Sequence, residues 1–171
     1  MQEATVGYLF RKVNGVTQTL LAKRNSLLFL DKWIGPGGKK EPRETVLDCL
    51  IREVWEEVKV RIDPKSARKI AIVDFYHPPN GIGNTEVWRV HFFGITRWVG
   101  EPMLTKSYSE IKWFDLNNLP YPEMTPDQKE WLPTALGNDQ PGKILVAQIH
   151  YGAELKTIEK KSMEFTTPTR H

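Results

Sequence analysis

The sequence predicts a mixed α/β fold, and three observations lead to that prediction. Two segments of strand-like composition, 5 to 12 and 16 to 23, flank Asn14-Gly15, a dipeptide that strongly favours a β-hairpin. Apolar residues recur at helical spacing between about 44 and 58. Runs rich in β-branched and aromatic residues then return in the second half of the chain. Strands on both sides of an amphipathic helix are expected of an α/β domain.

The segment between the hairpin and the helix predicts a strand at 27 to 30 and a glycine-rich loop at 35 to 38. After the helix, two further strands are expected at 69 to 77 and 85 to 98. The Pro78-Pro79-Asn80-Gly81 segment between them has the composition of a turn or loop.

The last third of the chain predicts a short strand at 111 to 114, followed by a proline-rich connection. A second helix should begin near Thr125, because Thr125-Pro126-Asp127-Gln128 has the pattern of a capping box with threonine as the N-cap and proline at the first helical position. Strands are expected again at 143 to 151 and 154 to 159.

The composition is that of a globular protein large enough to bury a core, with 171 residues, 40% hydrophobic and 26% charged. We expect one domain over 1 to 165, without internal repeats, and a short frayed tail over 166 to 171. The one cysteine, Cys49, excludes an internal disulfide. Its position near the apolar side of the helix predicts a packed thiol rather than a nucleophile.

Charge and hydropathy indicate the classes of partner. No apolar run approaches the roughly 20 residues that span a bilayer, and the beginning of the chain lacks a signal-peptide pattern. We therefore expect a cytoplasmic location and no membrane partner. The net charge of +3 suits an anionic ligand, but the mostly scattered lysines do not indicate stable nucleic-acid binding. The sequence leaves the oligomeric state open.

The helix carries the most specific chemical signal. At about 100° per residue, Glu53, Glu56 and Glu57 fall within an arc of about 100°, and the apolar residues fall on a separate stripe. Carboxylates are the ligands that Mg²⁺ prefers, with waters and substrate phosphates completing its shell. The helix alone also allows a simpler interpretation, since a glutamate-rich helix face is most often just solvated.

Gly38 is followed after five residues by Glu44, and after seven more by the segment from Arg52 to Val60. This spacing resembles the signature of the Nudix hydrolases, which cleave nucleoside diphosphates linked to another group. One position departs, because Lys59 stands where the family has a glycine that suits a left-handed helix end. Lys59 implies a longer helix or a strained turn, and every carboxylate is in place.

Outer segments extend the resemblance to the oxidised-purine nucleoside triphosphatase branch, over about residues 5 to 151. They are Trp33, Gly35, Gly37-Gly38-Lys39, Val90-His91-Phe92-Phe93, Trp113-Phe114 and the segment from Met124 to Trp131. The resemblance implies the Nudix α/β/α sandwich with a mixed sheet. It also implies water attack on a phosphorus of a purine nucleoside triphosphate, assisted by Mg²⁺ with Mn²⁺ as an alternative, yielding a nucleoside monophosphate and pyrophosphate.

The resemblance also implies roles for individual residues. The expected metal ligands are Gly38, Glu53, Glu56, Glu57 and Glu110. Arg52 matches a structural partner of Glu44, and from its helical spacing it could also orient Glu56, although a surface ion pair of little energetic value is an equally good interpretation. Glu110 lies where relatives place a further carboxylate that binds metal or takes a proton from water. The alignment there needs a gap, so a surface glutamate is an equal alternative for Glu110, and Glu101 is the second choice.

The implied substrate-binding residues are Trp33, Ile34, Gly37, Gly38, Lys39, Phe75, Asp127 and Gln128. Only Asp127 is unchanged among the base-contacting positions, since relatives carry asparagine where Ile34 stands and a second aspartate where Gln128 stands. The capping box accounts for the same segment without any ligand. Phe75, Trp88 and Trp131 could stack on a base, although six tryptophans mostly indicate core packing.

Three functions remain open on the sequence. The favoured one is a diphosphatase for a purine nucleoside triphosphate, including an oxidised one. The second is a Nudix enzyme for another X-linked diphosphate, such as a nucleotide sugar, a dinucleotide or an RNA 5′ end. The third, a non-catalytic nucleotide- or protein-binding module, is disfavoured by the intact glutamates.

Overall fold

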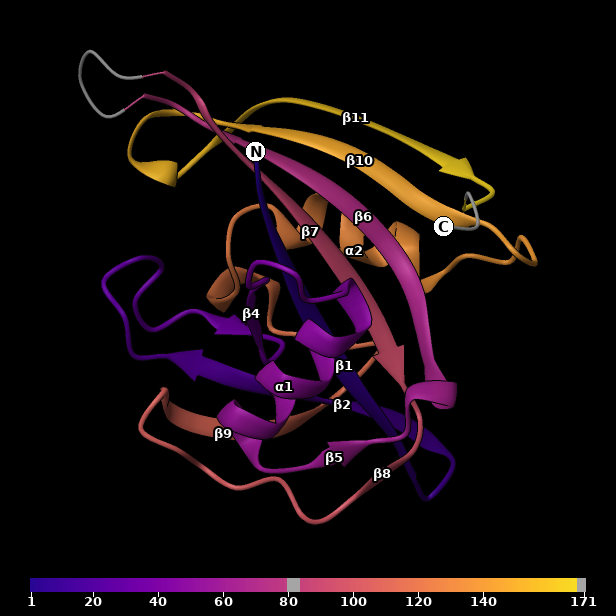
Figure 1. Cartoon of the computed structure of the whole chain (residues 1–171). Coiled ribbons are helices and arrows are strands. Elements are labelled where there is room, and N and C mark those ends of the chain that lie inside the picture. Colours follow the sequence, from indigo (N-terminus) through magenta and orange to yellow (C-terminus); the bar gives the residue numbers. More distant parts are fainter. Residues whose placement is uncertain (80–83, 169–171) are drawn as a thin grey trace.

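A computed structural model describes residues 1–79 and 84–168 of the chain. Its strands form one large mixed sheet in the order β11-β10-β6-β7-β1-β2-β3, in which β4 also pairs with β1 and β9 with β2 (Figure 1). The strands of this sheet are β1 (Gln2–Val13), β2 (Val16–Arg24), β3 (Trp33–Ile34), β4 (Gly37–Lys39), β6 (Ala67–His77), β7 (Glu86–Ile95), β9 (Tyr108–Asp115), β10 (Ile144–Tyr151) and β11 (Ile158–Thr166). The pairs β1–β7 and β6–β10 are parallel, and the other pairs are antiparallel.

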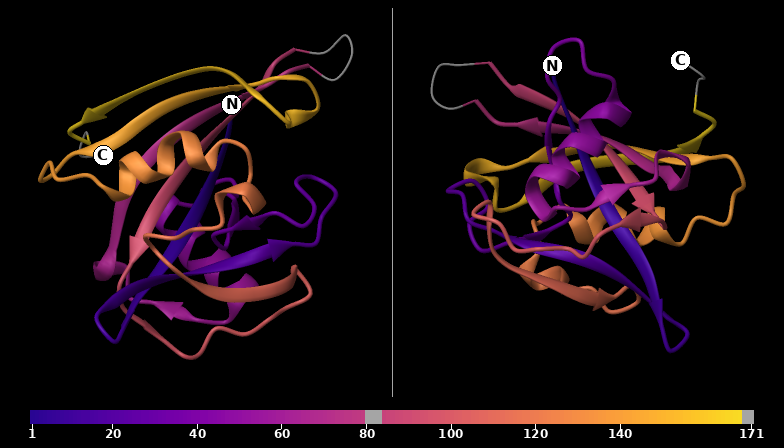
Figure 2. Two further views of the ribbon diagram at one scale, coloured as in Figure 1. Left: turned by 180° about the vertical axis from the view of Figure 1, so that it is seen from behind. Right: turned by 60° about the horizontal axis from the view of Figure 1, so that its bottom comes forward.

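Two helices cover opposite faces of this sheet. Helix α1 (Val46–Val58) lies in front of it and α2 (Gln128–Leu136) behind it in the view of Figure 1, and Figure 2 shows the same layers from behind. The apolar stripe of α1, including Leu50 and Val54, packs into one core, and Trp131 and Leu132 of α2 pack into the other. A two-stranded ribbon, β5 (Arg61–Ile62) with β8 (Trp98–Val99), and three 3₁₀ turns at Pro64–Ser66, Tyr121–Glu123 and Ala153–Leu155 complete the described fold.

The elements with strong local signals form as predicted. The hairpin around Asn14-Gly15 and the glutamate-bearing helix are confirmed. Helix α1 begins where the Thr45 hydroxyl accepts a hydrogen bond from the Asp48 amide at 3.1 Å, which satisfies one of the free amides of the first turn. It ends at Lys59, which adopts the left-handed conformation at φ 61° and ψ 30°. Of the two alternatives for Lys59, the chain forms the strained turn.

The predicted strand at 27 to 30 is wrong. This segment is part of a loop that Arg24 and Lys32 close through a 2.9 Å hydrogen bond from the Arg24 amide to the Lys32 carbonyl. Phe29 and Asp31 have positive φ values, which a strand does not allow. The short apolar run therefore carries side chains of a loop, and only Trp33–Ile34 beyond it pairs with β2.

Several predicted boundaries also differ. The run at 85 to 98 is two strands, β7 and β8, and the strand expected at 154 to 159 begins only at Ile158, after a 3₁₀ turn. Helix α2 begins at Gln128 with Asp127 as its N-cap, so Thr125 is not the cap. The expected frayed tail starts at the last residue of β11, Thr166, and 169–171 lie outside the described residues. Asn80-Gly81 of the expected turn also lie outside the described residues.

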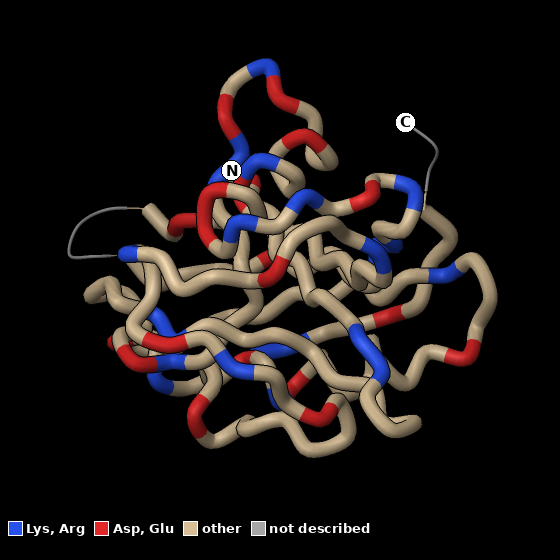
Figure 3. Tube along the Cα trace, turned by 90° about the horizontal axis from the view of Figure 1, so that it is seen from below, with Lys and Arg blue, Asp and Glu red and all other residues tan. Residues whose placement is uncertain are grey.

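Charge and hydropathy in three dimensions agree with the composition. Acidic and basic residues are mixed along the described trace (Figure 3). In the part of the chain that the structure describes, no helix has both the length and the apolar character needed to cross a membrane.

Candidate active site

The glycine loop packs directly on β1 and against the glutamate helix. Strand β4 pairs with β1 through Gly37 and Gly38. A Cβ at Gly37 would lie 2.0 Å from the Thr5 carbonyl oxygen, and one at Gly38 would lie 2.4 Å from Oε2 of Glu53. Any side chain at either position would displace the strand or the carboxylate. The two glycines therefore set how closely the loop approaches α1.

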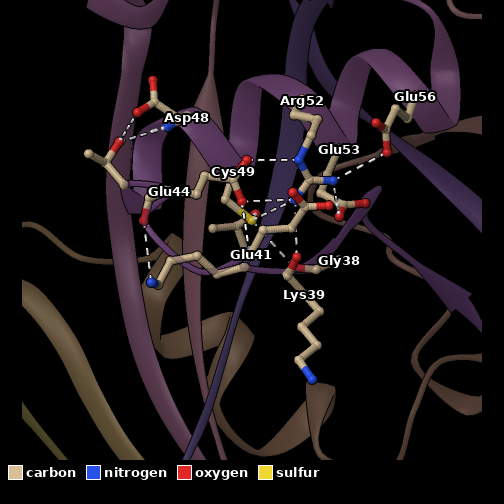
Figure 4. Close-up of polar contacts among 12 residues, drawn as sticks. Gly38, Lys39, Glu41, Glu44, Asp48, Cys49, Arg52, Glu53 and Glu56 are labelled. Carbon is tan, nitrogen blue, oxygen red and sulfur yellow. Dashed lines mark hydrogen bonds and ion pairs between the residues drawn. The ribbon is translucent and has the colours of Figure 1, made fainter.

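Arg52 organises the carboxylates along α1 (Figure 4). Its guanidinium binds Glu44 in a bidentate pair, with N–O distances of 2.7 and 2.9 Å. A third nitrogen, Nη1, donates to Glu53 at 2.6 Å and to Glu56 at 3.2 Å, and Nη2 donates to the Lys39 carbonyl at 3.1 Å. The hydrogen bonds from Arg52 lower the pKa of Glu44 to about 2. Arg52 thus links the glycine loop to Glu53 and Glu56, two of the three glutamates on the helix that are predicted metal ligands.

Glu57 lies deeper and is held by different groups. Its Oε2 accepts a hydrogen bond from the Gly37 amide at 2.8 Å and another from the Tyr108 hydroxyl. Burial raises the pKa of Glu57 to about 6, and the nearby charge of Glu53 acts in the same direction. Burial also raises the pKa of Glu53 and that of Tyr108.

The carboxylates form a donor set that fits a hard divalent cation. Within residues 1–79 and 84–168, no group of three or more His, Cys, Asp or Glu side chains is already arranged as a ligand set. Mg²⁺ needs only one or two carboxylates, because waters and substrate oxygens complete its octahedron. Burial raises the pKa of both Glu53 and Glu57, and neighbouring carboxylates add to the effect, Glu56 and Glu44 on Glu53 and Glu53 on Glu57. A cation bound between the carboxylates would relieve this cost of ionisation.

A cavity of about 910 Å³ opens beside this cluster. Glu57 and Tyr108 line it at the glutamate end, and Phe75 and Trp88 of β6 and β7 line it further along. The predicted substrate-binding residues in the lining are Ile34, Gly37, Gly38, Lys39, Phe75, Asp127 and Gln128. Trp33 is not among the described lining residues. It is buried and meets Phe114 edge-on, with ring centroids 5.0 Å apart.

Asp127 and Gln128 belong to a buried polar network in the cavity lining. Oδ2 of Asp127 accepts from the indole nitrogen of Trp131 at 2.8 Å and from the side-chain amide nitrogen Nε2 of Gln128 at 3.2 Å. Oδ1 of Asp127 accepts from the hydroxyl of Tyr151 at 2.5 Å. The side-chain oxygen Oε1 of Gln128 accepts from the hydroxyl of Tyr8 at 2.9 Å. The Gln128 side chain binds Tyr8 and Asp127 in this network instead of reaching back to Thr125, so the expected capping box does not form.

Within the described part of the chain, the further carboxylate expected at Glu110 makes no hydrogen bond with the helix glutamates and pairs with a lysine of β2 instead. Its side chain pairs with Lys23 at 3.2 Å and is 51% exposed. Glu101, the second choice, lies in an exposed loop. Neither residue is in the described cavity lining.

Sequence reasoning missed three tyrosines of the site: Tyr8 on β1, Tyr108 on β9 and Tyr151 on β10. Each comes from a strand far from the helix signature, and its contact depends on how the strands pair. The alternation of polar and apolar residues on β10 could have placed Tyr151 inside. No local pattern identifies the partner of Tyr108.

Comparisons with known proteins agree with this geometry. The family model described as NUDIX domain matches residues 2–135. The chain is 33% identical over 105 residues to the oxidized purine nucleoside triphosphate hydrolase of Danio rerio, and 30% identical over 105 residues to that of Mus musculus. Each match covers 61% of this chain and 63% of the relative, so the similarity extends over less than two thirds of the relatives' length.

Structural similarity extends further than sequence similarity. The crystal structure of the MutT protein from Bacillus halodurans superposes with a TM-score of 0.77 at 21% identity, covering 96% of this chain and 98% of that chain. At this identity the likeness concerns the fold, and it confirms the α/β/α sandwich with a mixed sheet.

Proposed function

Because the chain belongs to the NUDIX domain family, we propose that it is a Mg²⁺-dependent pyrophosphohydrolase for a purine nucleoside triphosphate, with oxidised purines among the candidates. The observation that carries the proposal is that Glu57 lines a nucleotide-sized cavity and lies on the same helix as Glu53 and Glu56, which Arg52 holds. A volume of about 910 Å³ lies within the usual range for ligand sites.

The two ends of the cavity suit the two ends of a nucleotide. Gly37 and Gly38 offer a close backbone approach at the glutamate end, which suits the polyphosphate. Lys39 lines the cavity too, and its ammonium lies 5.9 Å from the centroid of the Trp88 ring. Phe75 and Trp88 offer aromatic faces for a base, and Asp127 with Gln128 offers hydrogen-bonding groups for its edge. The triphosphate would then lie along α1.

Glu53, Glu56 and Glu57, with the Gly38 carbonyl, are the groups that would hold Mg²⁺ or Mn²⁺. The bound cation would neutralise charge on the phosphate oxygens and make water a better nucleophile. Arg52 holds Glu53 and Glu56 in place, and the Gly37 amide holds Glu57. Glu110 remains a proposed further carboxylate, which would have to exchange its Lys23 partner to reach the site.

A second candidate is a pyrophosphatase for another X-linked nucleoside diphosphate. Ile34 and Gln128 favour it, because both depart from the base-reading residues of the oxidised-purine branch. The domain proposed to carry either activity is the single unit over 1 to 165.

The test is a nucleotide panel with products separated by chromatography. Purified protein is incubated with Mg²⁺ and 8-oxo-dGTP, dGTP, dATP, a nucleotide sugar or a dinucleotide. We expect a nucleoside monophosphate and pyrophosphate from a purine triphosphate, and no product after chelation. Cleavage of only the sugar or the dinucleotide would support the second candidate.

Glu56→Gln should lower turnover by about two orders of magnitude or more, as loss of an electrostatic catalytic group typically does. Glu164→Gln, at an exposed glutamate of β11, is the matched control and should leave turnover unchanged. Near-normal turnover of Glu56→Gln would contradict the metal assignment.

A further inference from the structure

Strand β9 contains a bulge that turns Tyr108 toward the glutamate helix. Lys23 of β2 pairs with Glu110, and the next residue, Arg24, pairs with Tyr108, so Ser109 is an extra residue on β9. Without the bulge, Tyr108 and Glu110 would share one face of the strand, because side chains two residues apart point the same way. Bulges are enriched beside functional sites, where they redirect a side chain.

The redirected side chain is buried against Glu57. Tyr108 is 5% exposed and lines the cavity, whereas Glu110 on the same strand is half exposed. The Tyr108 hydroxyl donates a hydrogen bond to Oε2 of Glu57. The preceding segment also holds the backbone of Glu57, because the Thr105 hydroxyl donates to the Glu57 carbonyl at 2.8 Å.

Both hydrogen bonds on the Glu57 carboxylate end on the same oxygen. Gly37 and Tyr108 donate to Oε2, and Oε1 accepts none within the described residues. A carboxylate whose one oxygen is fixed by two donors has a fixed orientation, and its second oxygen keeps its lone pairs for another partner.

We propose that Tyr108 is a positioning residue that orients Glu57 toward the cavity. It lies on β9 two residues before Glu110, for which the sequence suggested a role as a further carboxylate of the site. This inference rests on the proposed function. A phenol is neutral near pH 7 and donates a hydrogen bond, so it holds Glu57 without adding a negative charge. A carboxylate in the position of the Tyr108 hydroxyl would repel the carboxylate of Glu57.

Tyr108→Phe removes the hydroxyl and keeps the ring. A hydrogen bond to a charged group is worth roughly tenfold to a hundredfold in an equilibrium, so we expect kcat to fall by about that factor while KM changes less than about twofold. Mn²⁺ binding to the substrate-free variant, measured by electron paramagnetic resonance, should weaken by about tenfold. Tyr76→Phe, a tyrosine that stacks on His150 away from the glutamates, is the matched control and should change neither quantity.

A double-mutant cycle separates positioning from general destabilisation. Tyr108→Phe should have little further effect in the Glu57→Gln background, because the hydroxyl acts through that carboxylate. Independent, multiplying effects on kcat and on Mn²⁺ binding would overturn the proposal. Unchanged Mn²⁺ binding in Tyr108→Phe would also overturn it.

Two further outcomes can still decide the role of Tyr108, namely a Tyr108→Phe variant that does not fold and a protein that hydrolyses no nucleotide. If Tyr108→Phe does not fold, the near-ultraviolet tyrosine spectrum of the wild-type protein on Mg²⁺ addition is the second measurement. A change that disappears in Glu57→Gln supports the proposal, and no change overturns it. If no nucleotide is hydrolysed, the proposed function fails, while Mn²⁺ binding still decides the role of Tyr108.

Discussion

Asp127 and Gln128, two polar residues of the cavity lining, already have hydrogen-bond partners within the protein. Asp127 accepts hydrogen bonds on both oxygens, and Gln128 both accepts from Tyr8 and donates to Asp127. A site rejects a wrong base most strongly when that base leaves buried groups unpaired, at about 1–3 kcal/mol for each group. Groups that already have protein partners impose a smaller penalty. Ile34, which has neither donor nor acceptor, imposes none.

We therefore predict weak discrimination between 8-oxo-dGTP and dGTP. Catalytic efficiencies measured under one condition should differ by well under a thousandfold, which corresponds to about 4 kcal/mol. Ile34→Asn adds a donor and an acceptor to the lining and should increase the ratio about tenfold or more, from the cost of one unpaired group. Ile34→Val is the control and should leave the ratio unchanged. A thousandfold preference in the wild-type protein would contradict this prediction.

The sequence was sufficient to predict the residues whose neighbours are local. Arg52 and Glu56 are four residues apart on α1, so helical spacing predicts the contact that the structure contains. The pair of Arg52 with Glu44 was implied by the resemblance to the Nudix signature, and the structure contains it as well. Tyr108 could not be predicted, because its direction depends on one extra residue in the pairing of β9 with β2. Strand register is a tertiary property, and a shift by one residue exchanges the two faces of a strand.

Whole helices and strands could also be predicted where their signals are local in the sequence. The hairpin and α1 have signals within the segment itself, in the form of a turn dipeptide, an N-cap and an apolar stripe. The run at 27 to 30 is apolar, but Leu28 and Phe29 line the cavity from a loop, so the hydrophobicity there belongs to the site rather than to a strand. Composition alone does not distinguish these two uses of apolar residues.

Lys59 at the end of α1 should limit the stability of this helix. A side chain in the left-handed region costs roughly 1–2 kcal/mol, and glycine avoids this cost but loses more entropy on folding. Lys59→Gly should therefore raise the free energy of unfolding by about 0.5–1 kcal/mol, seen as a higher urea midpoint at constant m-value.

Lys59→Ala is the matched control for this prediction. It removes the same cation above Trp55 but keeps a Cβ, so it should not stabilise the protein. Equal midpoints for the glycine and alanine variants would show that the turn is not strained.

At the scale of the whole molecule, β1 connects distant parts of the chain. It pairs with β2 and β4, which follow within 40 residues of sequence, and in parallel with β7, where Gln2 faces Trp88. Strand β10 likewise pairs in parallel with β6, with Leu145 facing Ala71. The glycine loop is thus supported by a strand that is itself completed by residues more than 80 positions away.

The residues from Gly37 to Glu57 are contiguous in sequence, yet this support by β1 means that they should not fold autonomously. A peptide of residues 1 to 66 contains the hairpin, the loop and α1, but lacks β7 and β9. Isolated hairpins are marginal in water, and so are helices of the 13 residues found in α1. Its circular dichroism should therefore show little helix and no cooperative melting, while the full chain melts in one transition; a sharp transition in the peptide would contradict this. The segment that carries the family signature would then be a chemical unit but not a folding unit, and transplanting it would require transplanting the sheet.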